Sequence, residues 1–234
     1  MAMEISRQNK TLCIKSLEAD GNELKQINDY TLEPLAAEQV YTFKAVIGNN
    51  ETDDRNSMPF SASALKDLSE LYRGKTMIRD HDPKAENQIA RVYATELRTD
   101  TSKSTGLGEP FTELVAKCYM AKTAENEGLI SEIKAGIKRE VSTGFAVNEF
   151  RCSICGAEVC KHWLGREYGG KKCMKIIKHC SDAYELSFVA VPAQPNAGTI
   201  KAAEAPEEPE ETALEAKKAA IMEEIGASRE KYKF

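Results

Sequence analysis

Residues 184–193 read Tyr-Glu-Leu-Ser-Phe-Val-Ala-Val-Pro-Ala, an apolar run that predicts a strand closed by Pro192. One carboxylate, that of Glu185, lies among the apolar neighbours. Burying an unpaired carboxylate is unfavourable, so Glu185 needs a partner. An imidazole in a functional site would serve, and a salt bridge to a lysine or arginine, or exposure on an edge strand, is the alternative.

A second strand-like segment, Glu-Val-Ser-Thr-Gly-Phe at 140–145, places the Ser142 hydroxyl where an extended segment meets a glycine. A serine becomes a nucleophile only when an imidazole takes its proton and a third group orients that imidazole. Two of the three histidines lie in a cysteine-rich segment, which leaves His81 as the candidate base. Thr143 is the neighbouring hydroxyl, and the period of two along a strand points it to the opposite face.

The remaining pattern predicts an α+β fold. Short apolar strands alternate with few helices, which favours a mixed or antiparallel β-barrel with helices packed outside. A serine at 61 or 63 can cap a helix that runs to about Tyr72, and Thr123 can cap a second one. The other predicted strands are 39–47, 76–79, 88–97 and 111–120.

Composition divides the chain into three parts. Residues 1–38 form a polar N-terminal segment, weakly ordered or with an edge hairpin near residues 20–22, and residues 39–200 form the barrel domain. Residues 201–234 combine an acidic, proline-containing linker with a helix-prone end. The net charge of −5 argues against nucleic acid as a partner of the whole chain. Neither a membrane span nor a secretion signal is recognisable, so a cytosolic location is expected.

Five of the seven cysteines fall within an insertion at 151–180, which indicates a metal site rather than disulfides in a reducing compartment. The turn Cys152-Ser-Ile-Cys155-Gly aims two thiolates at one ion, and Cys160 and His162 would complete a tetrahedral set. Four protein ligands close the coordination sphere, so we expect a structural zinc in a knuckle-like insertion. The alternative to a metal site is that these cysteines are free thiols in a loop. Further candidate ligands are Cys173, His179 and Cys180.

Several of these motifs occur in a recognisable order. Asp-His-Asp at 80–82 is followed by Gln-Ile-Ala-Arg-Val at 88–92, then by Val-Ser-Thr-Gly-Phe at 141–145 and by Glu-Leu-Ser-Phe-Val-Ala-Val-Pro-Ala-Gln-Pro-Asn-Ala from Glu185. This order resembles the prohead maturation proteases of tailed bacteriophages, which are related in fold to herpesvirus assemblin. The resemblance covers roughly residues 40–200.

The resemblance implies an assemblin-like β-barrel serine endopeptidase enclosed in the immature capsid within the host cytoplasm. Its expected substrates are the scaffold protein or an extension of the major capsid protein, together with the protease itself, and its activity is expected to depend on assembly or on a homo-oligomer. Matching motifs make Ser142 the nucleophile and His81 the general base. Glu185 is the preferred orienting acid, with Asp182 and His179 as competitors. The alternative is a catalytically inactive, zinc-containing protein that contacts the scaffold during assembly.

Overall fold

The computed structural model describes residues 19–200 of the chain. The acidic linker and C-terminal helix expected at 201–234, and most of the N-terminal segment expected at 1–38, lie outside these residues. Within the described range, no helix combines the length and apolar character needed to cross a membrane.

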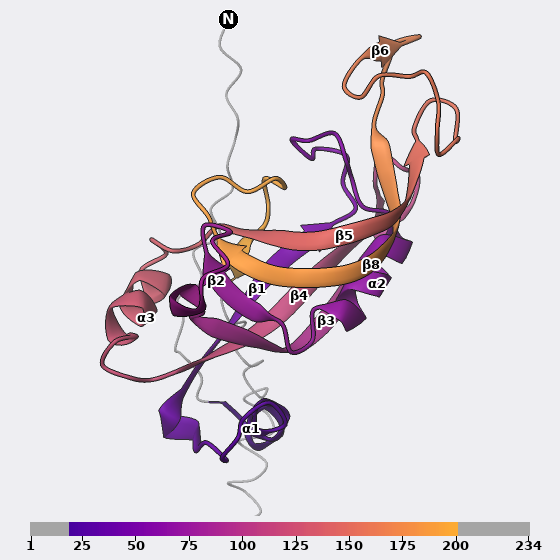
Figure 1. Ribbon diagram of the computed structural model, residues 1–234. Coiled ribbons are helices and arrows are strands. Elements are labelled where there is room, and N and C mark those ends of the chain that lie inside the picture. The colour runs from indigo at the N-terminus through magenta and orange to yellow at the C-terminus, as the bar shows by residue number, and fades with distance from the viewer. Residues whose placement is uncertain (1–18, 201–234) are drawn as a thin grey trace, which may run out of the picture. The chain divides into compact units, whose positions relative to one another are not determined.

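The described residues form an α+β fold dominated by one seven-stranded mixed sheet (Figure 1). The strands are β1 (Val40–Asn49), β2 (Thr76–Arg79), β3 (Ala90–Ser104), β4 (Pro110–Ala121), β5 (Val141–Cys152), β6 (Glu167–Tyr168), β7 (Lys171–Lys172), β8 (Lys175–Phe188) and β9 (Gly198–Ile200). The helices are α1 (Gly21–Asn28), α2 (Ala62–Leu71) and α3 (Glu127–Lys134), with short 3-10 turns at Ala37–Gln39 and Ala85–Asn87.

The sheet has the order β5-β8-β2-β3-β4-β1-β9, and β6 pairs only with β7. All pairs in the large sheet are antiparallel except β2 with β8, which run parallel. The sheet curls so that its two ends approach, and the rings of Phe43 on β1 and Phe188 on β8 stack with centroids 6.1 Å apart. The main core lies inside this curl.

The expected closed barrel is not formed by the described residues. The edge strands β5 and β9 meet only near an isolated bridge between Glu140 and Gly198. Because β9 has only three residues, it offers too short a partner for a continuous ladder along β5. From Ser142 onward, β5 is therefore an edge of the sheet.

The predicted helix after Ser61 is confirmed as α2. The Ser61 hydroxyl accepts a hydrogen bond from the amide of Ala64 at 3.3 Å, and Leu65, Leu68 and Tyr72 are buried on one face. α2 packs mainly against β8. The prediction of a hairpin near residues 20–22 is wrong, because helix α1 begins there. The Asp20 carboxylate caps this helix by accepting hydrogen bonds from the amides of Asn22 and Glu23.

Candidate active site and metal centre

His81 is held by the turn that follows β2. Asp80 and His81 both adopt the left-handed backbone conformation, with φ of 52° and 55°. This conformation costs roughly 1–2 kcal/mol per non-glycine residue, so surrounding contacts must maintain it. The amide of Asp80 donates to the carbonyl of Phe188 at 3.0 Å, and the amide of His81 donates to the Ser187 hydroxyl at 2.9 Å. Both anchors come from the end of β8, the parallel neighbour of β2.

The imidazole of His81 contacts the carboxylate of Glu185. Nδ1 of the ring lies 2.8 Å from Oε1. The Glu185 side chain is only 13% exposed, whereas that of His81 is 42% exposed, so the acid is enclosed and the ring reaches solvent. The second oxygen, Oε2, is buried without a hydrogen-bond partner among the described residues. The buried carboxylate thus has an imidazole partner, which is one of the alternatives that the sequence left open.

Gly144 makes room for this carboxylate. Gly144 is directly opposite Glu185 in the β5–β8 ladder. A Cβ atom on Gly144 would overlap Oε1 of Glu185 and would lie 3.2 Å from its Cδ. A side chain at position 144 would therefore require the Glu185 carboxylate to shift.

Ser142 lies on the same face of the sheet as this pair. It is directly opposite Ser187, and directly opposed residues of an antiparallel pair project to the same side. Glu185 is two residues from Ser187 on β8 and shares that side. Within residues 19–200 no hydrogen bond joins the Ser142 hydroxyl to His81. Contacts between nucleophile and base are often long in a free enzyme and shorten when substrate binds.

Thr143 projects to the other face, as the period of two predicts. Its partner in the ladder is Leu186, which is fully buried. Nearby, the Tyr72 hydroxyl donates to the carbonyl of Gly144 at 2.9 Å. Burial, together with the charge of Glu185, raises the pKa of Tyr72 well above its usual range, so the phenol remains a donor. Tyr72 therefore supports the strand beneath the site.

The two residues that compete with Glu185 for the role of orienting group, Asp182 and His179, have other partners. Asp182 pairs with Lys75 at 3.2 Å, and His179 contacts Asp67 of α2 at 2.8 Å. Neither side chain contacts His81.

The candidate metal ligands converge at the far end of the β5–β8 hairpin. The ligand atoms of Cys152, Cys155, Cys160 and His162 all lie within 4.8 Å of one another, close enough to hold one metal ion. The Cys152 sulfur is 3.7 Å from Nδ1 of His162. Burial raises the pKa of Cys152, but hydrogen bonds from the amides of Ile154 and Cys155 and from nearby thiols outweigh it and lower that pKa to about 6. A thiolate, the form that binds metals, is thereby favoured.

Of the three further candidate ligands, Cys173 lies beside this cluster, whereas Cys180 and His179 lie away from it. Cys173 is buried and its sulfur lies 3.8 Å from that of Cys152, and burial together with this neighbour raises its pKa to about 11. Cys180 is buried further along β8, where burial raises its pKa to about 12. Cys173 is adjacent to the cluster, whereas Cys180 and His179 are not part of it.

Two residues with structural roles at the site were missed by sequence reasoning. Ser187 is completely buried and holds the backbone of His81, and Gly144 clears space for Glu185. The only signal for Ser187 was a hydroxyl within an apolar strand. No protein-family model, curated protein or solved structure matches this chain.

Proposed function

We propose that this chain is a serine endopeptidase of tailed-phage capsid maturation. The observation that carries the proposal is the contact between His81 and Glu185, on the face of the sheet to which Ser142 also projects. In this proposal Ser142 would be the nucleophile, His81 the general base and Glu185 the orienting acid. The order of sequence motifs points to the same family.

In the proposed mechanism, Glu185 accepts the Nδ1 proton of His81 in a hydrogen bond and fixes the tautomer of the ring. Nε2 is then free to take the proton of the Ser142 hydroxyl as the oxygen attacks the peptide carbonyl. The carbon–nitrogen bond breaks, and the amine leaves with the proton from His81. Water, deprotonated by His81, then hydrolyses the ester and restores the Ser142 hydroxyl.

The edge strand gives a physical basis for binding an extended substrate. Because β5 has no neighbour along most of its outer side, a peptide can add to it by main-chain hydrogen bonds next to Ser142. The proposed substrates are the scaffold protein or an extension of the major capsid protein. Enclosure within the assembling prohead in the host cytoplasm would raise the local substrate concentration, so modest intrinsic activity would suffice.

The metal centre has a structural role in this proposal, and zinc is the ion that best suits three cysteines and one histidine. Four protein ligands leave no open position for substrate. Cys152 is ten residues beyond Ser142 on β5, about 30 Å at roughly 3.3 Å per residue. An ion there is too distant to act on the peptide bond.

The second candidate function is an inactive, zinc-containing assembly protein. The missing hydrogen bond between Ser142 and His81 among the described residues favours it. In that case the curled sheet would serve only as a scaffold for the cysteine-rich insertion.

Co-expression with the capsid protein of the same virus tests the two candidates. We expect the unmodified chain to shorten the capsid or scaffold protein, and Ser142→Ala and Glu185→Gln to leave it whole or nearly so. Thr143→Val is the matched control, since this neighbour faces the other side of β5, and it should retain cleavage. Cleavage that persists in Ser142→Ala would refute the nucleophile assignment, and an unprocessed substrate with every variant would favour the inactive protein.

A further inference from the structure

The metal-binding end of the β5–β8 hairpin extends beyond the large sheet. We define the tip as residues 152–174, between the end of β5 and the start of β8. Figure 1 shows it as loops around β6 that project past the strands and leave helices α1 and α3 at a distance. Its only regular structure is the two-stranded β6–β7 ladder. Neither the hydrolytic site nor the curled core requires such a projection.

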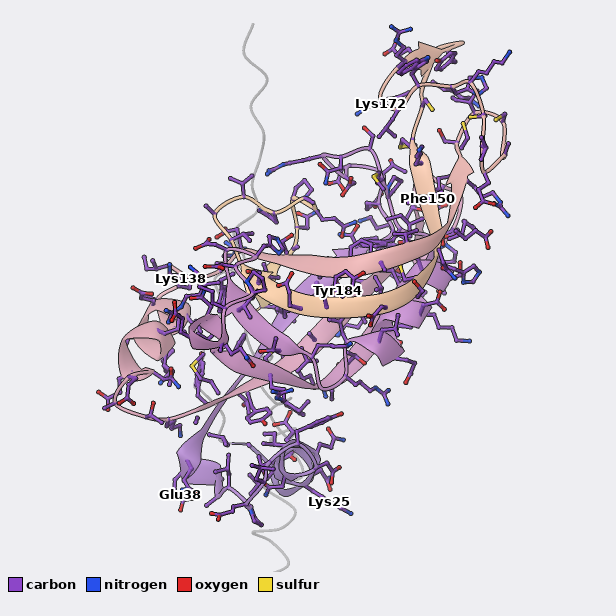
Figure 2. The ribbon with its side chains drawn as sticks, viewed as in Figure 1. Lys25, Glu38, Lys138, Phe150, Lys172 and Tyr184 are labelled. Carbon is purple, nitrogen blue, oxygen red and sulfur yellow. The ribbon has the colours of Figure 1, made fainter. Side chains whose placement is uncertain are left out.

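The tip has four cationic side chains against two carboxylates, those of Glu158 and Glu167, so its net charge is positive. Four exposed cations form no ion pair within residues 19–200: Lys161, Arg166, Lys171 and Lys172. Just outside the tip, by contrast, Arg151 pairs with Glu149 at 2.8 Å and with Glu158 at 3.2 Å. Figure 2 shows Lys172 at this end of the molecule and Lys25 of α1 at the opposite end.

Apolar side chains are exposed among these cations. Val159 is 90% exposed, Trp163 is 69% exposed and Leu164 is 42% exposed. The Trp163 backbone is fixed, since its amide donates to the Tyr168 hydroxyl at 2.9 Å, and the Tyr168 ring packs against His162. The guanidinium of Arg166 lies 5.8 Å from the indole ring. An uncovered aromatic ring on a fixed stretch of backbone, beside apolar and cationic neighbours, is typical of a binding surface.

We infer that the tip is a docking surface for an acidic segment of a partner protein, one in which carboxylates alternate with apolar residues. The four cations would pair with the carboxylates, and Val159, Trp163 and Leu164 would bury the apolar side chains. The metal ligands preorganise the loops, so little conformational entropy is lost when the partner binds. This inference does not depend on the proposed proteolytic function.

A nucleic acid fits this surface less well. Stacking of a base on Trp163 would use the indole, but it would leave Val159 and Leu164 exposed. The net charge of −5 for the whole chain also repels a long polyanion, whereas a short acidic peptide meets mainly the local charge.

Trp163 is the only tryptophan of the chain, so tryptophan fluorescence, excited selectively over the eight tyrosines, reports on the tip alone. The full chain, loaded with zinc, is titrated with a synthetic peptide of alternating glutamate and leucine, with a lysine–leucine peptide, and with single-stranded oligothymidylate. We expect saturable binding of the glutamate peptide, no binding of the lysine peptide, and weakening as salt is raised.

Charge reversal locates the surface. We expect Lys171→Glu with Lys172→Glu to weaken binding of the glutamate peptide by about tenfold or more. Lys25→Glu, an exposed lysine on α1, is the matched control and should bind as the unmodified chain does. The metal content of each variant verifies that the tip is intact, and the salt titration of the unmodified chain provides a test without any substitution.

Three outcomes would overturn the inference. They are no fluorescence response to the glutamate peptide, equal loss of binding in the control variant, and tighter binding of oligothymidylate than of the peptide. The last result would assign the tip to nucleic acid.

Discussion

Replacing Gly144 with alanine is the sharpest test of the geometry at the site. The new methyl group would occupy the space of the Glu185 carboxylate, whose Cδ lies 3.2 Å from the position of that Cβ. Because the Glu185 side chain is largely enclosed, its carboxylate must turn away and give up the 2.8 Å contact with His81. We therefore expect a chain that folds but cleaves poorly.

The expected loss of cleavage rate in Gly144→Ala follows from the loss of the contact between His81 and Glu185. An oriented acid–base pair contributes about 10²- to 10⁴-fold to rate, and Gly144→Ala should lose a large part of this factor. The free energy of unfolding should fall by only about 1–3 kcal/mol, the usual cost of overpacking. The assays are the rate of capsid-protein cleavage and the rate of fluorophosphonate labelling at Ser142, measured beside a denaturation curve.

Two further variants separate the clash from a general loss of stability. In Gly144→Ala combined with Glu185→Ala, activity should equal that of Glu185→Ala alone, because both act through the same carboxylate. Gly128→Ala in α3 is the glycine control: no atom lies within 4 Å of its new Cβ, so it should stabilise the chain by about 0.5–1 kcal/mol. Full activity in Gly144→Ala would refute the role given to Glu185.

Three other predictions concern the supports of the site and the tip. Ser187→Ala removes the hydroxyl that accepts the His81 amide and should lower the free energy of unfolding by about 1–3 kcal/mol while slowing cleavage, and an unchanged denaturation midpoint would contradict this. Tyr72→Phe loses the hydrogen bond to the Gly144 carbonyl and should cost about 0.5–1.5 kcal/mol in the same measurement. Cys155→Ser should lower bound zinc in elemental analysis, whereas Cys173→Ser should retain it, and the reverse pattern would place Cys173 among the ligands.

Local pattern was sufficient to predict several elements of the fold. The apolar spacing after Ser61 predicted α2, and the β-rich run at 76–79 matches β2. Closure of the barrel could not be predicted in this way, because it depends on how many residues of β9 reach β5. α1 was missed because only Ile27 of this polar segment is completely buried, although Asp20 at its start is a residue favoured for capping.

The candidate site was likewise predicted only where local sequence patterns determine it. A carboxylate on an apolar strand requires a partner, which led to Glu185, and the geometry provides one in His81. Ser187 and Gly144 act through contacts with neighbouring strands: Ser187 of β8 holds the turn after β2, and Gly144 of β5 lies opposite Glu185. The spacing of residues along a single strand does not reveal such contacts. The cysteine spacing anticipated the cluster of four, since neighbouring ligands on a tight turn are a local property.

The single parallel pairing in the sheet has a consequence for biosynthesis. The amides of Asp80 and His81 donate to atoms of Phe188 and Ser187, which come more than a hundred positions later in the chain. A ribosome-bound or prematurely ended product that stops short of this segment has the imidazole but neither its anchor nor its acid. If the proposed activity holds, hydrolytic competence arises only after nearly the whole domain has emerged and folded, and such fragments leave surrounding proteins intact.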